Sequence, residues 1–356
     1  MRELRQQAGQ LLILGFDGTE TTPRLRSLLR ELQPGGVILF APNLAEPQQT
    51  WRLLHDCQAL VPTPLFRCVD LEGGMVDRLK AMLAPAPSAA AVAATHDRKL
   101  FRRHGRLIGE EVRALGFNTD FAPVLDLGFP ASRSVLGTRT ASDDPKKTTL
   151  SAREFLRGLR EARVLGCGKH FPGLGEAALD THHELPSVQK VWKRMWAEDL
   201  YPYRALRREM AFVMVAHAAY PAVTGDRSPA SISRKWIAEI LRKKIFYPGL
   251  VISDDLEMGG VLAARPIEEA AVQTLRAGAD LFLVCHNEEA VRRAYQAVVR
   301  EAERDARFAR RVREAAARVL AFKKRSRELK ARPAHPSKAA VERLRGAMLR
   351  FTDEVR

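Results

Sequence analysis

The sequence predicts an α/β protein that folds as a (β/α)8 barrel of the TIM type, in a single domain with a helical extension at its C-terminal end. Eight short apolar runs alternate with longer amphipathic segments along the chain. Most runs are continuous in apolar residues, which is typical of parallel strands covered on their outer face. Eight strand–helix units in about 325 residues fit the size of such a barrel. The predicted strands are Leu11–Phe16, Gly36–Phe40, Leu65–Asp70, Thr119–Leu125, Val164–His170, Phe212–His217, Leu250–Asp254 and Leu281–Cys285.

Helices are predicted between these runs. After the first run, Thr22 and Pro23 form a plausible cap and first turn, leucines follow at helical spacing, and the sequence 33–36 (QPGG) ends the helix. The stretch from Asp97 to Gly116 contains no proline, and its apolar residues fall on one helical side. The same spacing occurs in 236–241 and in 304–324, so we expect helices there too.

The barrel is expected to occupy residues 1–330. Residues 331–356, opened by Pro333 and Pro336, look like a basic linker and a terminal helix. We find no second full domain and no internal repeat of fixed period. A doubly wound open sheet is the alternative fold, but no GxGxxG motif follows the first strand and there is no P-loop, which weighs against a nucleotide-binding fold.

Composition narrows the functional classes. Hydrophobic residues make up 46% of the 356 residues and charged residues 28%, as in an ordinary globular protein. No apolar run approaches the ~20 residues that span a bilayer, and the charged N-terminus does not resemble a signal peptide, so we expect a cytoplasmic protein.

The net charge of +16 is densest after Lys323. Without an RNA-binding aromatic motif, a zinc finger or a Gly-rich basic arm, we interpret it as a solvated basic surface and expect no nucleic-acid partner.

The four cysteines, Cys57, Cys68, Cys167 and Cys285, are expected to be small buried thiols in a reducing compartment. No CxxC or HExxH spacing occurs, and His182 and His183 are adjacent, so we expect no metal site and no cofactor.

Polar residues gather at the C-terminal ends of the predicted strands. In a (β/α)8 barrel the chemistry is located at that end. A single strand-end Asp could cap a helix, and a single His could be a core residue, but the same placement on six strands indicates a functional site. The residues concerned are Asp70, Glu72, Asp126, Lys169, His170, His217, Asp254, Asp255 and His286.

The segment 169–175 (KHFPGLG), followed by Asp180-Thr181-His182, carries the strongest functional signal. It places a lysine and an imidazole at a strand end and a carboxylate–imidazole pair on the adjoining loop. Such groups can transfer protons in a reaction on a carbohydrate. A histidine can serve as acid and base because its unperturbed pKa of ~6.5 lies near working pH.

These motifs resemble the single-domain β-N-acetylglucosaminidases (β-hexosaminidases) of glycoside hydrolase family 3, from about Gly9 to about Ala321. The motifs that carry the resemblance are 34–40 (PGGVILF), 70–74 (DLEGG), 118–126 (NTDFAPVLD), 169–175 with 180–182, and 253–258 (SDDLEM).

The resemblance implies a retaining mechanism through a covalent glycosyl-enzyme. It implies Asp254 as nucleophile, His182 as acid/base on the loop after the fifth strand, and Asp180 as its orienting partner. The implied substrate is a terminal β-linked N-acetylglucosamine of peptidoglycan fragments or chitin-type oligosaccharides, removed by exo-acting hydrolysis. The implied sugar-binding residues are Asp70, Arg78, Arg139, Lys169 and His170.

Strand geometry agrees with this assignment. Asp254 and Asp255 are consecutive on a strand and therefore face opposite sides. We predict that Asp254 points into the barrel mouth and that Asp255 is structural. His183 is interpreted as loop surface.

The chain departs from the usual family pattern at three positions. Leu174 stands where the family usually has His, Leu71 where it has Gln, and Met75 where it has Arg. These changes keep two alternatives open: a phosphorylase, in which phosphate replaces water as acceptor, and a sugar-binding barrel without turnover. A family β-glucosidase is disfavoured because the chain has no room for the added α/β domain that such enzymes usually carry. The sequence does not assign an oligomeric state.

Overall fold

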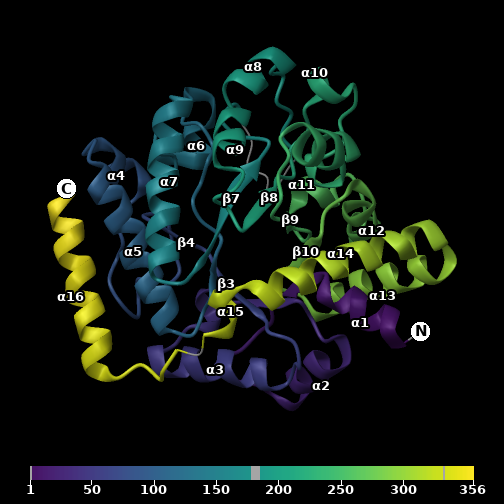
Figure 1. Cartoon of the computed structure of the whole chain (residues 1–356), viewed down its shortest axis with the longest axis horizontal. Helices are drawn as coiled ribbons and strands as arrows, with labels where there is room; N and C mark the ends of the chain where they lie inside the picture. Colours follow the sequence, from purple (N-terminus) through teal and green to yellow (C-terminus); the bar gives the residue numbers. More distant parts are fainter. Residues whose placement is uncertain (1, 178–184, 332) are drawn as a thin grey trace.

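The computed structural model describes residues 2–177, 185–331 and 333–356, and within them eight parallel strands close into a barrel (Figure 1). Neighbouring strands follow the order β1-β10-β9-β8-β7-β6-β3-β2. The (β/α)8 prediction is confirmed and the open-sheet alternative is wrong, because β1 pairs with both β2 and β10. Every predicted run overlaps one barrel strand, although β7 and β9 each extend one residue beyond the predicted end. The strands are β1 (Leu12–Leu14), β2 (Gly36–Ile38), β3 (Phe66–Val69), β6 (Thr119–Asp120), β7 (Leu165–Phe171), β8 (Phe212–Val215), β9 (Leu250–Asp255) and β10 (Leu281–Val284).

Helices surround this barrel. The α-helices are α1 (Arg2–Gln10), α2 (Pro23–Leu32), α3 (Pro47–Ala59), α4 (Ala89–Ala94), α5 (Arg98–Ala114), α6 (Arg133–Leu136), α7 (Pro145–Glu161), α8 (Trp192–Ala197), α9 (Leu200–Leu206), α10 (Pro221–Thr224), α11 (Gly259–Leu262), α12 (Ile267–Ala277), α13 (Glu288–Arg304), α14 (Ala306–Arg325), α15 (Arg327–Lys330) and α16 (Lys338–Glu354). The 3₁₀ turns are η1 (Ala41–Asn43), η2 (Pro130–Ser132), η3 (Gly137–Arg139) and η4 (Ala230–Ile232), and η5 (Lys235–Lys244) is a π-helix.

The caps explain why the predicted helices begin where they do. The Thr22 hydroxyl accepts a hydrogen bond from the amide of Leu25, and Pro23 occupies the first turn of α2. Asp97 caps α5 by accepting from the amide of Lys99. The helix expected around Trp236 is present as η5, whose apolar residues are buried as the spacing predicts.

A small antiparallel hairpin, β4 (Leu71–Gly73) with β5 (Val76–Asp77), interrupts the barrel after β3 and was not predicted. Its turn runs through Gly73 and Gly74, whose φ angles are +85° and +61°. A side chain is strained at such angles, so two glycines suit the turn. The Asp77 carboxylate closes the following loop by accepting from the amides of Leu79 and Ala86.

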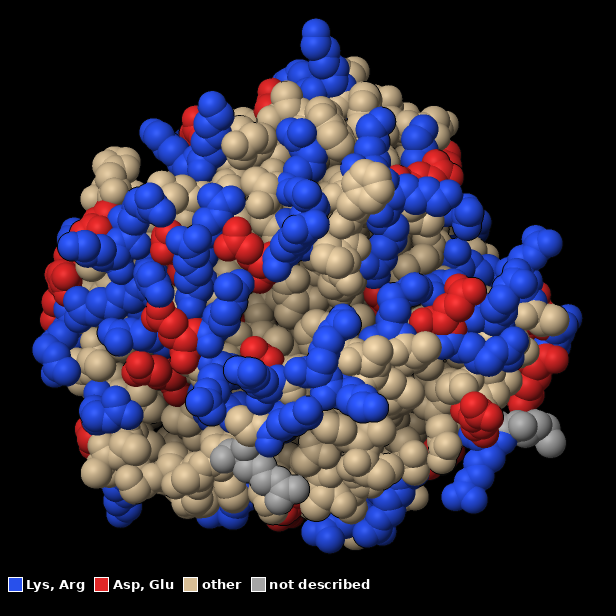
Figure 2. Space-filling view, viewed as in Figure 1, with Lys and Arg blue, Asp and Glu red and all other residues tan. Residues whose placement is uncertain are grey.

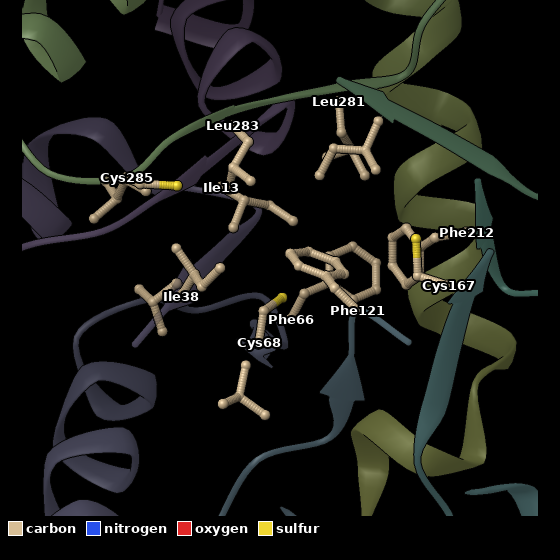
Figure 3. Packing of buried hydrophobic residues seen from close by; sticks show 14 of the residues in the cluster. Ile13, Ile38, Phe66, Cys68, Phe121, Cys167, Phe212, Leu281, Leu283 and Cys285 are labelled. Atoms are coloured by element: carbon tan, nitrogen blue, oxygen red, sulfur yellow. The ribbon is translucent and has the colours of Figure 1, made fainter. Parts of the chain in front are cut away.

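The barrel interior is apolar, and Figure 3 shows aromatic rings and thiols packed between the strands. The Phe66 and Phe212 rings lie 5.0 Å apart in an edge-to-face arrangement, which suits the ring quadrupoles. Cys68, Cys167 and Cys285 point into the same core. All four cysteines are buried free thiols, which agrees with the prediction.

The C-terminal extension packs against the barrel. After α14 and α15 the chain runs along α3 and then forms α16, which lies beside α5 (Figure 1). The indole N–H of Trp51 donates to the carbonyl of Pro333, and the buried Phe351 ring stacks on His104 with centroids 5.8 Å apart. A domain boundary at residue 330 remains a prediction. Among the described residues, no helix is long and apolar enough to cross a membrane.

Candidate active site

A cavity of about 430 Å³ opens at the C-terminal ends of the barrel strands. The structure brings six of the predicted site residues together on its wall. They come from the ends of β7 and β9, from the residues that directly follow β3 and β5, and from η3. These six are Asp70, Arg78, Arg139, Lys169, His170 and Asp254.

Glu72 links two of the cations in this cavity. Its carboxylate receives two hydrogen bonds from Arg139, both of 2.8 Å, and lies 2.7 Å from the Lys169 ammonium. Burial alone would raise the pKa of Glu72, but the charges of Lys169 and Arg139 outweigh burial and hold the pKa below its usual value. Glu72 is therefore a buried anion that fixes both cations in place. The sequence placed Glu72 at a strand end but gave it no role.

Lys169 also bonds Asp70, with Nζ 2.7 Å from the carboxylate. Burial would lower the pKa of Lys169, but Asp70 and Glu72 raise it above its usual value, so the ammonium stays charged. Asp70 is the more exposed of these two carboxylates, and it keeps acceptor positions directed to the cavity.

Asp126 holds His170 in position. The ring Nδ1 of His170 lies 2.6 Å from the carboxylate, and the same carboxylate accepts from the amides of His170 and Leu174. Because Nδ1 is the nitrogen bonded to the carboxylate, Nε2 is the nitrogen that faces Arg139, at 3.4 Å. Asp126 is a positioning residue that the sequence noted only as a strand end. The long-range contact to His170 leaves no local signal.

Asp254 lies at the end of β9 and lines the cavity. Burial would raise its pKa, but the nearby His170, His217 and Lys169 and a hydrogen bond from the Asp255 amide lower it. Asp254 is thus held as a carboxylate. Asp255 is more buried, and its carboxylate accepts from the amides of Glu257 and Cys285. Burial raises the pKa of Asp255 to about 7.

Arg78 differs from the other two cations. It makes no ion pair with any residue in the described ranges, and its guanidinium lies over the Phe40 ring at 5.7 Å. Its Nε is buried without a hydrogen-bond partner. Arg78 is therefore the cation of this cavity that keeps donors free for a bound molecule.

The three departures from the family pattern lie in different places. Leu174 lines the cavity with its side chain almost fully buried. Leu71 is buried outside the cavity wall, and Met75 is 61% exposed on the hairpin. Of the three, only the change at Leu174 alters the surface that meets a bound molecule.

Residues 3–322 match the family described as the glycosyl hydrolase family 3 N terminal domain. The chain belongs to glycosyl hydrolase family 3. A beta-hexosaminidase of Alkalilimnicola ehrlichii is 38% identical over 287 residues, which cover 79% of this chain and 82% of that protein. A beta-hexosaminidase of Pseudomonas aeruginosa is 36% identical over 290 residues, covering 81% and 86%.

Solved structures of this family have the same barrel. A glycoside hydrolase family 3 beta-N-acetylglucosaminidase from Paenibacillus sp. str. FPU-7 superposes with a TM-score of 0.92 and 34% identity, covering 99% of this chain and 68% of that one. Native NagZ from Neisseria gonorrhoeae superposes with a TM-score of 0.74 and 29% identity, covering 88% and 97%. The chain is therefore a glycoside hydrolase, and its substrate is a glycoside.

Three residues discussed from the sequence, Asp180, His182 and His183, lie outside the described residues of this family 3 barrel. Described residues on the two sides of that segment contact each other. Lys190 contacts Glu176 at 3.2 Å and Asp199 at 2.6 Å. Within the described ranges, no group of three or more His, Cys, Asp or Glu is placed to hold a metal ion.

Proposed function

We propose that the chain is a retaining exo-β-N-acetylglucosaminidase with Asp254 as its nucleophile. The observation that carries this proposal is the position of Asp254: an ionised carboxylate at a strand end, facing a cavity lined with groups that can hydrogen-bond a sugar. The family's activity on glycosides and the names of its relatives agree with it.

Two displacements at the anomeric carbon make up the mechanism. In the first, the Asp254 carboxylate forms a C–O bond while the glycosidic bond breaks and His182 gives its proton to the leaving oxygen. In the second, His182 takes a proton from water, the water oxygen attacks the anomeric carbon, and the bond to Asp254 breaks. Asp180 orients the imidazole and stabilises its charged form. The roles of His182 and Asp180 rest on the sequence motif.

The sugar hydroxyls are bound by charged groups whose geometry is set in advance. Lys169 and Asp70, held together at 2.7 Å, offer a donor and an acceptor side by side. Arg78 contributes donors that no described residue uses. Arg139 and His170 complete the polar wall, and their orientations are fixed by Glu72 and Asp126.

Terminal N-acetylglucosamine on peptidoglycan fragments or chitin-type oligosaccharides is the substrate class that we propose. The cavity volume of about 430 Å³ lies in the range of small-molecule sites, which suits one sugar residue better than an extended chain. The printed names of the relatives, beta-hexosaminidase and beta-N-acetylglucosaminidase, point to the same sugar.

The test is hydrolysis of an aryl N-acetyl-β-glucosaminide by wild type, Asp254→Asn and Asp255→Asn. Removal of the nucleophile is expected to lower kcat by ~10³-fold or more. Asp255→Asn changes the adjacent carboxylate and is expected to lower it by less than ~10-fold. Trapping with a fluorinated mechanism-based inhibitor should label the peptide that contains Asp254. A label on another peptide, or equal rates for all three proteins, would remove Asp254 from the mechanism.

Phosphorolysis is less favoured by the charges in the cavity. Lys169 and Arg139 are both neutralised by Glu72 and Asp70, which leaves Arg78 as the unpaired cation among the described lining residues. We therefore expect free sugar and no sugar 1-phosphate when phosphate is added. Sugar binding without any product after long incubation would instead indicate a barrel that has lost turnover.

A further inference from the structure

A second cavity, of about 480 Å³, lies at the other end of the barrel, away from the candidate active site. Its walls come from α3, from the loop that leads into β3, and from the chain around α15 and Pro333. Nothing in the proposed hydrolysis uses it.

Arg67 of β3 is the residue that makes this cavity unusual. Successive strand residues face opposite sides, and Phe66 and Cys68 point into the barrel (Figure 3), so Arg67 points outward into the second cavity. The residue is only 7% exposed. Its guanidinium makes no hydrogen bond or ion pair with any residue in the described part of the chain, and Nε is buried without a partner.

Three other arginines, which are partly buried, have carboxylate partners. Arg139 is paired with Glu72, and Arg242 and Arg311 both contact Asp280. A buried cation without a partner destabilises a fold, because the lost hydration is not replaced. An anion bound in the cavity would supply the missing partner of Arg67.

The charges around the cavity favour a ligand with more than one negative charge. Lys330 lines the cavity. Burial, with a smaller contribution from the charge of Arg113, lowers the pKa of Arg67 to about 10. No acidic residue is among the described residues that line the cavity. Asp56 and Glu328 are neighbours in sequence of the lining residues His55 and Leu329; Asp56 is about half exposed, and Glu328 accepts a hydrogen bond from Ser326. Neither contacts the Arg67 guanidinium.

Apolar side chains and rings make up most of the remaining wall. The Trp51 and His55 rings are stacked with centroids 4.9 Å apart, and Pro62, Pro64 and Pro333 line the same space. Such a surface suits a planar or aliphatic group, whereas the arginine fork suits a phosphoryl head.

One wall belongs to the C-terminal extension. Leu329, Lys330 and Pro333 lie beyond residue 322, where the family match ends, and the Trp51 indole holds Pro333 through a 3.1 Å hydrogen bond. The cavity therefore depends on a segment outside the matched family domain.

We propose that this second cavity is a binding site for a small phosphate monoester, whose phosphoryl group pairs with Arg67 and Lys330 and whose apolar body packs between α3 and Pro333. The site is separate from the glycoside-binding cavity, and its ligand binds without being transformed.

The test is a calorimetric titration of the full chain with phenyl phosphate and with inorganic phosphate at constant ionic strength. Wild type is expected to bind both, and phenyl phosphate more tightly. Arg67→Met should weaken binding by at least ~10-fold, and Lys330→Met by several-fold. Lys243→Met removes an exposed lysine elsewhere and should change affinity by less than ~2-fold.

A second measurement separates a ligand site from a structural role. Without phosphate, Arg67→Met should be at least as resistant to urea as wild type, because it removes an unpaired buried charge, and it should still hydrolyse the aryl glycoside. The proposal would be overturned if Arg67→Met lost urea resistance or bound phosphate as tightly as wild type. It would also be overturned if Lys243→Met lost as much phosphate affinity as Arg67→Met. If Arg67→Met does not fold, the phosphate affinities of Lys330→Met and Lys243→Met are compared instead, and equal affinities would overturn the proposal. Equal affinity for the two phosphates would overturn the assignment of an apolar body.

Discussion

At the scale of single residues, Glu72 has the largest structural influence on the candidate active site. Its two oxygens hold Arg139 and Lys169, which are 67 and 97 positions away in the sequence. Both cations face a cavity in which a sugar is proposed to bind, so their positions decide where its hydroxyls can be held. A carboxylate that fixes two cations of the cavity can therefore control how a sugar is bound there.

Replacing Glu72 by Gln should impair both stability and activity. The change leaves Lys169 with Asp70 and leaves Arg139 without a carboxylate partner among the described residues. Breaking a buried ion pair from one side costs ~3–5 kcal/mol. We expect that loss in the free energy of unfolding in urea, and a ~10- to 100-fold lower kcat/KM on the aryl glycoside. Glu161→Gln breaks the exposed pair with Arg102 and should cost less than ~1 kcal/mol. Similar values for the two variants would contradict the assignment.

The same residue predicts how stability changes in acid. Lys169 and Arg139 lower the pKa of Glu72 in the folded state, so the contribution of Glu72 is complete above the ordinary carboxyl pKa of ~4.3 and is lost as the pH falls through the folded value. The difference in unfolding free energy between wild type and Glu72→Gln should therefore be constant from pH 7 to ~5 and shrink below ~4. A constant difference down to pH 3 would contradict the lowered pKa.

At the scale of elements, the sequence predicted the strands better than the connections. Most of the predicted strands are continuous apolar runs, which are a local signal, and all eight barrel strands overlap the predicted runs. The β4–β5 hairpin has only three and two residues per strand, too few for a periodic pattern. The π-helical winding of η5 could not be predicted either, because it leaves the spacing of the apolar residues almost unchanged.

The candidate site was predictable in part for a related reason. Asp70, Lys169, His170 and Asp254 stand at strand ends, where barrel topology collects functional groups. The roles of Glu72 and Asp126 depend on contacts between distant segments, and no spacing within the chain announces such contacts.

The terminal helix α16 gives a prediction at this scale. It is attached to α5 through buried side chains, among which Phe351 stacks on His104 and lies under Arg103 at 5.2 Å. Phe351→Ala should lower the free energy of unfolding by ~3–5 kcal/mol, measured in urea. Leu349 of the same helix is 45% exposed, and Leu349→Ala should cost less than ~1 kcal/mol. Neither change should alter KM, and equal costs would show that α16 is not docked as described.

At the scale of the whole molecule, polarity changes along the barrel axis. Charged and polar groups form the mouth, and aromatic and aliphatic side chains fill the middle (Figure 3). Lys and Arg spread over the outer surface in the face that Figure 2 shows, with Asp and Glu between them, as expected for a solvated basic surface.

Lys323 of α14 is a buried charged residue that affects the pH dependence of folding. Its ammonium is buried, donates to Gln10 and to the carbonyl of Gly35, and lies 5.0 Å from the Phe66 ring centroid. No carboxylate in the described ranges forms an ion pair with it. Burial lowers the pKa of Lys323 to about 7. Between pH ~7 and ~10.4 the unfolded chain therefore binds this proton and the folded chain releases it, so this residue makes stability rise with pH.

Lys323→Met should remove that dependence. Both acceptors keep another donor, Thr63 for Gln10 and the Phe66 amide for Gly35, so the change leaves neither without a partner. The free energy of unfolding of wild type should rise with pH by up to ~1.4 kcal/mol per unit more steeply than that of the variant between pH ~7 and ~10. Below pH ~7 both states of wild type bind the proton, so the two profiles should run parallel there. Lys324→Met changes the exposed neighbour and should follow wild type throughout, whereas parallel profiles for wild type and Lys323→Met above pH 7 would show that the buried ammonium keeps an ordinary pKa.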